Sequence, residues 1–411
     1  MITQKIKGVL KMITTEDFNE STFAWPKGFY SDATHIGLKN QKLDFGWIYS
    51  KVPAKTAGVY TTNKFCAAPT AKTKEIVSKN HELQAIIANS AIANSCTGLQ
   101  GENDVLTEQA LVAKRLDISP ELVGVASTGL IGAFLPMDKI EKGISELTLA
   151  TNTDITKAIL TTDTKAKIIS VDFDIQGIPC KISGFAKGSG MIHPKMATML
   201  AFVTTDIAIA DNTLQPLLSE LTDITFNQIT VDGDTSTNDM VLTLANGLAG
   251  NAPIKENSPD YQLFKAALHF VLQKLAQKIA ADGEGATKLV ESNVLNAQSS
   301  SDAQKIAKAI VGSNLVKAAI FGADPNWGRI ISTIGATSAD FNPKTIDIKI
   351  NEFPVVQQSL AVDFDEAQIS NSLKKDIITL TVNLNDGDFA GQAWGCDLTY
   401  DYVKINATYS S

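Results

Sequence analysis

The sequence predicts an α/β protein of layered mixed and antiparallel sheets with helices. Several short segments alternate apolar and polar residues as strands do, while others space their apolar residues as helices do. The two kinds interleave without a strict βαβ rhythm, which favours antiparallel pairing. The chain has 411 residues, of which 44% are hydrophobic, so its core is large enough for two or three folding units.

The first predicted elements are strands. Residues 122–126 form an apolar strand before Thr128-Gly129, and we expect a helix after Leu130. Further along, alternation predicts a hairpin about the turn Gln176-Gly177. Its two apolar faces are Val171, Phe173 and Ile175 on one strand and Ile178, Cys180 and Ile182 on the other. A strongly apolar run at 199–203 predicts a buried strand.

The second half of the chain mixes both patterns. Helical spacing predicts a helix that ends at Asp282-Gly283. Its apolar positions are Leu268, Val271, Leu272, Leu275 and Ile279. Ser301 could cap a second helix that runs through Ile306 and Ile310. We expect further strands at 317–321, 377–384 and 398–405, with a turn at 385–387 that joins the last two as antiparallel strands.

Charge and cysteine content argue against several functional classes. The net charge is −8 and the chain has no run of lysine and arginine, so nucleic acids and anionic membranes are poor partners. The four cysteines show no CxxC spacing and there are only four histidines, so we predict no metal site and no disulfide framework. No apolar run reaches the ~18 residues of a membrane helix, and no signal-peptide pattern opens the chain. We therefore expect a soluble, cytoplasmic protein.

The most informative stretch is KGSGMIHPKMATML at 187–200. Gly188 and Gly190 permit close approach of the backbone, and Pro194 stiffens the chain that follows. The small residue Ala197 precedes Thr198, which lies where this loop enters the apolar strand.

This arrangement suits an N-terminal threonine nucleophile. The Thr198 hydroxyl could attack the Ala197 carbonyl, and water would hydrolyse the resulting ester. The freed α-amino group has a reference pKa of about 7.7–8.0, so near neutral pH it can act as the base for the same hydroxyl. The residues alone leave a second interpretation open, in which Thr198 is an ordinary β-branched strand residue.

The stretch at 187–200 resembles the self-cleavage signature of the ornithine acetyltransferase family, the glutamate N-acetyltransferases of arginine biosynthesis. Further motifs similar to that family's occur in the expected order over essentially the whole chain. They are AAPT (67–70), STGLIG (127–132), LTTDT (160–164), DGDTSTND (232–239), DGEGATK (282–288), GADPNWGRI (322–330) and YVKINATYSS (402–411). The resemblance implies a self-cleaving fold of the N-terminal-nucleophile type, with an α chain of residues 1–197 and a β chain of residues 198–411.

The resemblance assigns catalytic roles to three residues. Thr198 would be the nucleophile, which accepts acetyl as an ester and passes it to an amine. Thr128 and Gly129 would form the oxyanion hole, one through its hydroxyl and the other through its backbone N–H. From the residues alone, Thr128-Gly129 could equally serve as a turn between a strand and a helix, and both functions can hold together.

Six positions match the family's substrate contacts, and they are Thr161, Lys187, Thr198, Glu284, Asn406 and Ser411. Lys187 could bind a substrate carboxylate, or it could favour the neutral form of the Thr198 amine by charge repulsion. Glu284 could pair with a substrate ammonium. Neighbouring threonines leave the assignment of Thr161 open by a position or so.

Two segments depart from the family pattern. Lys195 stands where asparagine is common, and Ala91-Ile92 replaces an expected Gly-Asn pair. Neither departure removes a residue to which chemistry is assigned. A third segment, DGDTSTND (232–239), has acidic spacing that hints at calcium, but it lacks the glycine and the terminal glutamate of an EF-hand loop. We interpret it as Asx turns and assign it no role in the site.

The resemblance implies transfer of acetyl from N-acetylornithine to glutamate through an acetyl-threonine, which gives ornithine and N-acetylglutamate. No cofactor is expected, although acetyl-CoA is a possible acetyl donor in bifunctional members of the family. The two chains are expected to assemble as a heterotetramer of two α and two β chains. Two alternatives stay open: an N-terminal-nucleophile amidase or aminopeptidase of the same fold, and a non-catalytic binding protein on the same scaffold.

Overall fold

The computed structural model describes residues 18–193, 199–256 and 258–408. Nine of the strands in this part of the chain form one sheet. They are β1 (Phe18–Ser21), β2 (Phe29–Thr34), β3 (Phe45–Tyr60), β4 (Glu82–Asn89), β5 (Val123–Ser127), β6 (Lys167–Ile175), β7 (Ile178–Lys187), β8 (Leu200–Thr205) and β9 (Met240–Ala245). The strands follow the order β1-β6-β7-β8-β9-β3-β4-β5, and β2 pairs with β3.

Pairing in this sheet is mixed. Most neighbours are antiparallel, but β4 with β5 and β8 with β9 are parallel. β6 and β7 form the predicted hairpin, and the turn residues Gln176 and Gly177 both have positive φ. The predicted apolar strand is β8, which lies between β7 and β9 with every residue buried. The predicted class, an α/β fold with mixed and antiparallel sheets, is therefore confirmed.

Six more strands form a second sheet. They are β10 (Leu289–Ala297), β11 (Asp347–Ile350), β12 (Phe353–Gln357), β13 (Leu360–Ala361), β14 (Ile377–Asn383) and β15 (Phe389–Cys396). Within the described residues their order is β13-β12-β11-β14-β10-β15. β10 runs parallel to β14 and antiparallel to β15, so this sheet is also mixed.

Helices cover both sheets. The chain before Pro259 contributes α1 (Ala68–Asn80), α2 (Gly98–Leu116), α3 (Met137–Glu146), α4 (Ile155–Ala158) and α5 (Leu214–Asp223), with 3-10 turns at Pro120–Leu122 and Phe226–Gln228. The chain from Pro259 onward contributes α6 (Pro259–Ala281), α7 (Ser300–Gly312), α8 (Asn314–Phe321), α9 (Trp327–Gly335), α10 (Glu366–Ser372) and α11 (Tyr400–Ala407). Among the described residues, no helix combines the length and apolarity needed to cross a membrane.

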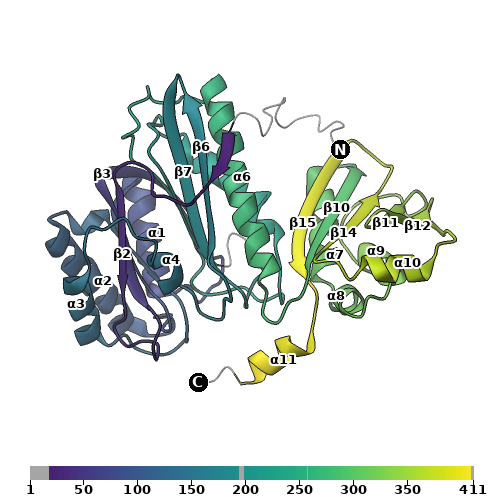
Figure 1. Cartoon of the computed structure of the whole chain (residues 1–411), viewed down its shortest axis with the longest axis horizontal. Helices are drawn as coiled ribbons and strands as arrows, with labels where there is room; N and C mark the ends of the chain where they lie inside the picture. Colours follow the sequence, from purple (N-terminus) through teal and green to yellow (C-terminus); the bar gives the residue numbers. More distant parts are fainter. Residues whose placement is uncertain (1–17, 194–198, 257, 409–411) are drawn as a thin grey trace.

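Helix α6 lies between the two sheets (Figure 1). It contacts β6 and β7 of the first sheet and β10 and β15 of the second. The helix was predicted from its apolar spacing, and its Ser258 side chain caps the amino-terminal end by accepting the Tyr261 N–H at 3.1 Å. Its apolar residues and those of both sheets share one core, which includes Phe264, Leu275 and Trp394. This shared core joins the two sheets into layers.

Two predicted strands are helices instead. Residues 317–321 belong to α8, because the Ser313 side chain caps the segment by accepting the Val316 N–H, and Val316, Ala319 and Ile320 face the core together. Residues 398–405 fall largely in α11, since the strand of this region is β15 and ends at Cys396. A short apolar run fits a buried helix as well as a strand, so periodicity could not decide either case.

Two further details differ from the prediction. β14 lies before the predicted turn at 385–387 and β15 after it. The two strands are not paired, because β10 lies between them in the sheet. The cap of α7 is Ser299, whose hydroxyl accepts the Asp302 N–H at 3.1 Å, rather than Ser301. Both errors concern long-range pairing or the exact end of an element rather than its presence.

Helix α2 carries a buried carboxyl group with an expected effect on stability. Glu108 is 1% exposed, and its Oε2 has no hydrogen-bond partner among the described residues. Burial, reinforced by the Asp104 carboxylate, raises the pKa of Glu108 to about 8. The folded protein therefore keeps a proton that the unfolded chain releases above about pH 4.5. Its stability should fall as the pH rises from about 4.5 to about 8.

Glu108→Gln should remove this pH dependence. We expect the variant to unfold with a free energy a few kcal/mol above that of the wild type at pH 8, with a smaller difference at pH 5, as urea unfolding at both pH values would measure. Glu102→Gln is the matched control, because Glu102 is exposed on the same helix. An equal response of both variants would contradict the role of Glu108.

Candidate active site

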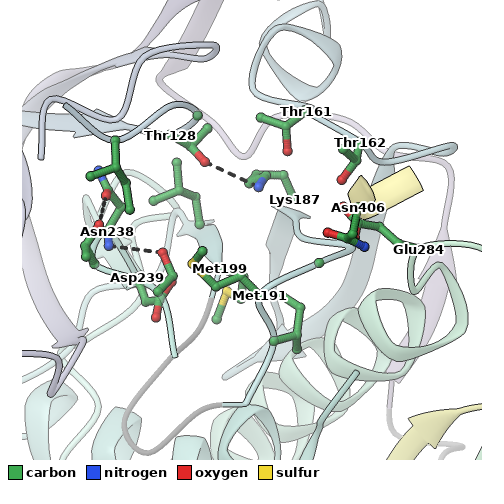
Figure 2. A pocket seen from close by; sticks show the side chains of 17 residues that line it. Thr128, Thr161, Thr162, Lys187, Met191, Met199, Asn238, Asp239, Glu284 and Asn406 are labelled. Atoms are coloured by element: carbon green, nitrogen blue, oxygen red, sulfur yellow. Dashed lines mark hydrogen bonds between the residues drawn. The ribbon is translucent and has the colours of Figure 1, made fainter. Parts of the chain in front are cut away.

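One pocket gathers the described residues that the sequence analysis selected. It holds about 780 Å³ of empty space, including its open mouth. The predicted residues that line it are Thr128, Gly129, Thr161, Lys187, Glu284 and Asn406 (Figure 2). They come from the loop after β5, the loop before β6, the end of β7, the loop after α6 and helix α11. Segments up to 278 residues apart (406 − 128) therefore meet in one site.

Three predicted site residues, Ala197, Thr198 and Ser411, lie outside the described residues. Met199 and Leu200, which directly follow the predicted cleavage position, line the pocket and are buried. The carboxyl-terminal helix α11 reaches the same pocket through Asn406. The roles of Ala197, Thr198 and Ser411 stay predictions.

Lys187 and Thr128 face each other inside the pocket. The Lys187 Nζ lies 3.3 Å from Thr128 Oγ1, in hydrogen-bonding range, and both side chains are buried (Figure 2). Burial lowers the pKa of Lys187, while the carboxylate of Asp163 opposes that shift. As an ammonium group, Lys187 donates to Thr128 Oγ1, which leaves the Thr128 hydroxyl proton free to point elsewhere.

Asp163 fixes the loop that carries Thr161 and the end of the strand that carries Lys187. Its side chain is fully buried, and its Oδ1 accepts the Gly188 N–H at 2.6 Å while its Oδ2 accepts the Thr161 N–H at 3.0 Å. Burial alone would raise the pKa of Asp163. The ammonium groups of Lys187 and Lys167 and the Gly188 N–H outweigh burial and lower the pKa to about 2. Asp163 is therefore an anion that holds the Thr161 loop against the end of β7.

Lys167 extends this network to the loop that carries Glu284. Its Nζ pairs with Asp163 Oδ1 and with Asp282 Oδ2, both at 2.5 Å, and its side chain is 2% exposed. The Asp282 carbonyl in turn accepts the Ser189 hydroxyl at 2.6 Å, and the Ser189 carbonyl accepts the Glu284 N–H at 3.0 Å. Three loops of the site are thus tied together beneath the pocket.

This network was not predicted from the sequence. Asp163 and Asp282 stand inside the motifs LTTDT and DGEGATK, but neither received a role, and Lys167 lies outside every motif. The available signal was the alternation of β6, which turns Lys167 inward among apolar residues. A lysine on a core face needs a carboxylate partner, and that inference could have been made.

Lys167→Met should strongly destabilise the fold. The substitution leaves Asp163 and Asp282 close together without their shared cation, so we expect a loss of about 3–5 kcal/mol in the free energy of unfolding. Guanidinium unfolding followed by tryptophan fluorescence would measure this loss. Lys165→Met is the control, since Lys165 is exposed two positions earlier. A loss below about 1 kcal/mol for Lys167→Met would contradict the importance of the network.

Glu284 and Asn406 form the other wall of the pocket. The Asn406 Nδ2 donates to Glu284 Oε2 at 2.8 Å, which links α11 to the loop after α6. A side chain at Gly190 would meet the Glu284 carboxyl, because an added Cβ would lie 2.4 Å from its carboxyl carbon. The absence of a side chain at Gly190 is therefore what admits the Glu284 carboxylate to the pocket.

Gly129 lies in a tight crossing of two backbone segments. Its φ is +131°, and an added Cβ would lie 2.2 Å from the Ala91 carbonyl carbon. The neighbouring amides of Thr128 and Leu130 donate to Asn89 O and Ala91 O. The Gly129 N–H donates to no acceptor among the described residues, so it is available to a ligand. Together with the Thr128 hydroxyl it offers two donors at one point of the pocket.

One of the two departures from the family pattern, Ala91, lies at this crossing of the backbone with Gly129. Ala91 has a φ of +76°, in the left-handed region that favours glycine, and the expected residue at this position was glycine. Its carbonyl still accepts the Leu130 N–H at 2.9 Å, so the crossing forms despite the alanine side chain. The other departure, Lys195, lies outside the described residues.

The pocket also contains a segment to which we assigned no role. Ser236, Thr237, Asn238 and Asp239, the second half of the DGDTSTND motif, line it. In the first half, Asp232 Oδ1 accepts the Asp234 N–H at 3.3 Å, as expected of an Asx turn. Within the described part of the chain, no group of three or more histidine, cysteine or acidic residues is arranged to hold a metal ion.

Comparisons with known proteins agree on one family. The ArgJ family matches residues 30–411. A Lactiplantibacillus plantarum protein named arginine biosynthesis bifunctional protein ArgJ is 60% identical over 400 residues, which cover 97% of this chain and 100% of that protein. A Streptococcus mutans protein of the same name is 54% identical over 391 residues, with 95% and 98% covered.

A solved structure also resembles this chain. The crystal structure of arginine biosynthesis bifunctional protein argJ from Bacillus halodurans has 52% sequence identity and a TM-score of 0.50. The match covers 51% of this chain and 99% of that chain. Sequence and structure comparisons thus identify the same group of proteins.

Proposed function

The chain belongs to the ArgJ family, and we propose that it acts in arginine biosynthesis as an acetyltransferase that moves acetyl from N-acetylornithine to glutamate. In this proposal Thr198 carries the acetyl group between the substrates as an ester. The products are ornithine and N-acetylglutamate. Its relatives bear the name bifunctional, and the second activity we propose is synthesis of N-acetylglutamate from glutamate and acetyl-CoA.

The observation that carries the proposal is the convergence of complementary groups in one pocket. Lys187 and Glu284 bring opposite charges to its walls, and Thr128 and Gly129 bring two hydrogen-bond donors. An amino acid carries an ammonium and a carboxylate, so charged walls of both signs suit ornithine and glutamate alike. Paired donors suit the oxyanion of an acyl transfer.

The first chemical step is self-cleavage. The Thr198 hydroxyl attacks the Ala197 carbonyl and the peptide C–N bond breaks. The Ala197 acyl group is then an ester on the Thr198 oxygen, and the Thr198 nitrogen is a free α-amino group. Water then hydrolyses this ester, which releases residues 1–197 as one chain and residues 198–411 as another. The new α-amino group has a pKa near neutrality, so it can serve as the base for its own hydroxyl.

Acetyl transfer follows in two half-reactions. The Thr198 hydroxyl attacks the acetyl carbonyl of N-acetylornithine and gives its proton to the α-amino group. The amide bond breaks, ornithine leaves with that proton, and acetyl-threonine remains. The amine of glutamate then attacks the ester carbonyl, and the bond between the acetyl group and the Thr198 oxygen breaks. N-acetylglutamate leaves, and the Thr198 hydroxyl regains its proton. Each half-reaction passes through a tetrahedral oxyanion, which the Thr128 hydroxyl and the Gly129 N–H stabilise.

The remaining contacts hold the substrate. Glu284 pairs with a substrate ammonium, and Asn406, which is hydrogen-bonded to Glu284, fixes that carboxylate. Thr161 and Ser411 complete the substrate contacts, and Lys187 either binds a carboxylate or keeps the Thr198 amine neutral. No cofactor is needed. We also propose a cytoplasmic heterotetramer of two α and two β chains.

Release of ornithine with and without glutamate tests the function. Purified protein is incubated with N-acetylornithine, and both ornithine and N-acetylglutamate are measured. Transfer predicts that glutamate accelerates ornithine release and that the two products appear in equal amounts, with ping-pong kinetics. If the rate of ornithine release is the same with and without glutamate, the protein is instead an amidase. Ligand binding without any turnover would indicate a binding protein, and either result would refute the proposal.

A further inference from the structure

The DGDTSTND motif, which received no role from the sequence, contains an asparagine that lines the pocket. Asn238 is 4% exposed and lines the pocket beside Thr128 (Figure 2). Its Nδ2 donates to Ser127 O at 2.9 Å and to Ala93 O at 2.6 Å. Its Oδ1 accepts the Thr237 hydroxyl at 2.6 Å.

These bonds leave the Asn238 amide no N–H donor for a substrate. An asparagine amide has two N–H donors, and both are used by backbone carbonyls. Those carbonyls belong to residues 111 and 145 positions away along the chain. The side chain therefore connects separate parts of the fold, which is the pattern of a positioning residue rather than of a ligand contact.

The two carbonyls flank the donors proposed for the oxyanion. We call residues 127–130 the oxyanion loop. The peptide plane between Ser127 and Thr128 is held on both sides, because Asn238 donates to its carbonyl and Asn89 O accepts its N–H at 3.1 Å. The second carbonyl, that of Ala93, lies in the segment that pairs with this loop through the Ala93 N–H and Leu130 O. Asn238 is thus hydrogen-bonded to both of the backbone segments that cross at Gly129.

The segment that carries Asn238 is itself firmly anchored. The carbonyls of four consecutive residues, 236–239, accept hydrogen bonds from the chain between residues 61 and 70. The donors are Thr61 Oγ1 to Ser236 O, Ala67 N to Thr237 O, Thr70 Oγ1 to Asn238 O and Thr61 N to Asp239 O, at 2.7, 2.9, 3.1 and 3.0 Å. A side chain on such a support can hold its partners with little freedom.

The other end of the motif reaches the opposite wall of the pocket. Asp232 accepts the N–H groups of Met191 and Ile192 at 2.7 and 2.9 Å, one on each carboxylate oxygen. The Val231 carbonyl, directly before it, accepts the ammonium of the buried Lys317. One continuous segment therefore spans from the wall at 191–192 to the oxyanion loop.

We infer that Asn238 is a positioning residue for acetyl transfer, which holds the oxyanion loop at a fixed place relative to the opposite pocket wall. The inference rests on the proposed function. Without the amide, the Ser127 and Ala93 carbonyls lose this partner, and the peptide plane before Thr128 is held only on its N–H side, by Asn89 O. A displacement of about 1 Å at an oxyanion donor is enough to cost about 10²-fold in rate.

The test replaces Asn238 by leucine, which has a similar size and no donors. We expect kcat of Asn238→Leu for acetyl transfer to fall about 10–100-fold, with KM for N-acetylornithine within about threefold of the wild type. Asp234→Asn is the matched control, because Asp234 is exposed in the same motif and should keep wild-type kinetics. Thr237→Val removes only the hydrogen bond to Asn238 Oδ1 and leaves both bonds of its Nδ2. We therefore expect a smaller loss of kcat, of a few-fold.

Hydrogen–deuterium exchange of the full-length protein separates the inference from the proposed function. Asn238→Leu should accelerate exchange of the amides in the oxyanion loop and leave those of α6 unchanged. If this exchange is unaffected, or if KM rises while kcat is kept, the positioning role is refuted even in an active enzyme. If the wild type transfers no acetyl, the proposed function fails, and the catalytic role of Asn238 fails with it whatever the exchange experiment gives.

Discussion

Thr198→Ala should remain a single chain of 411 residues and lose acetyl transfer by a factor on the order of 10⁴ or more. In the proposed mechanism the substitution removes the oxygen that attacks the Ala197 carbonyl, so the chain is not cut. Because it is not cut, no α-amino group is released to act as base. One change thus removes the nucleophile directly and the base indirectly, which makes this the largest expected effect in the protein.

The measurement combines intact mass with the acetyl-transfer assay. The wild type should give two masses, one ending at Ala197 and one beginning at Thr198, while Thr198→Ala gives one. Thr198→Ser is the matched control, since a serine hydroxyl at the same place should still allow cleavage and part of the transfer rate. A Thr198→Ala chain that is cut between residues 197 and 198 would contradict self-cleavage by this residue, and an uncut but fully active variant would contradict the acetyl-threonine.

The sequence predicted the local features of the fold better than its long-range pairing. The hairpin at Gln176-Gly177 and the helix ending before Asp282 follow from periodicity, because alternate or helical spacing puts their apolar residues on one face. The run at 317–321 misled the prediction, since its apolar residues suit a strand or a buried helix and only tertiary packing decides. The separation of β14 from β15 by β10 has no local signal at all, because β10 lies about 80 residues earlier.

The site was predicted residue by residue through motifs, and the structure brings the described ones together. What the motifs could not reveal is support from distant residues. Lys167 pairs with Asp282 across 115 positions, and Asn238 reaches Ala93 across 145. No periodicity or spacing rule connects such positions. A buried lysine or asparagine indicates that a partner must exist, but only the fold identifies it.

Thr128→Val should lower kcat for acetyl transfer about 10²–10³-fold with little change in KM. Valine matches threonine in shape but has no hydroxyl, so in the proposed mechanism the oxyanion keeps only the Gly129 N–H as a donor. Thr128→Ser keeps the hydroxyl and should retain most of the rate. Steady-state kinetics of both variants would measure the difference. An equal loss in both would point to packing rather than to the hydroxyl.

The contact between Lys187 and Thr128 makes a sharper form of this test possible. The Lys187 Nζ lies 3.3 Å from Thr128 Oγ1, and an ammonium there can only donate, so the Thr128 proton must point to a different acceptor. If Lys187 acts through Thr128, Lys187→Met should cost much less in a Thr128→Val background than in the wild type. If Lys187 acts only by binding a substrate carboxylate, the two losses in kcat/KM should multiply.

The outcome of this double-mutant cycle decides whether Lys187 supports the Thr128 hydroxyl, as their contact suggests, or binds a substrate carboxylate, one of the roles that the sequence left open. Strong coupling, confined to kcat, would assign the lysine to the oxyanion hole, where its charge also makes the Thr128 hydroxyl a better donor. Independent losses, with the Lys187→Met effect mainly in KM, would assign it to the substrate carboxylate. Burial already lowers the pKa of this lysine, so the Asp163 anion beside it has a defined part in either case: it helps Lys187 to keep the charge on which both roles depend.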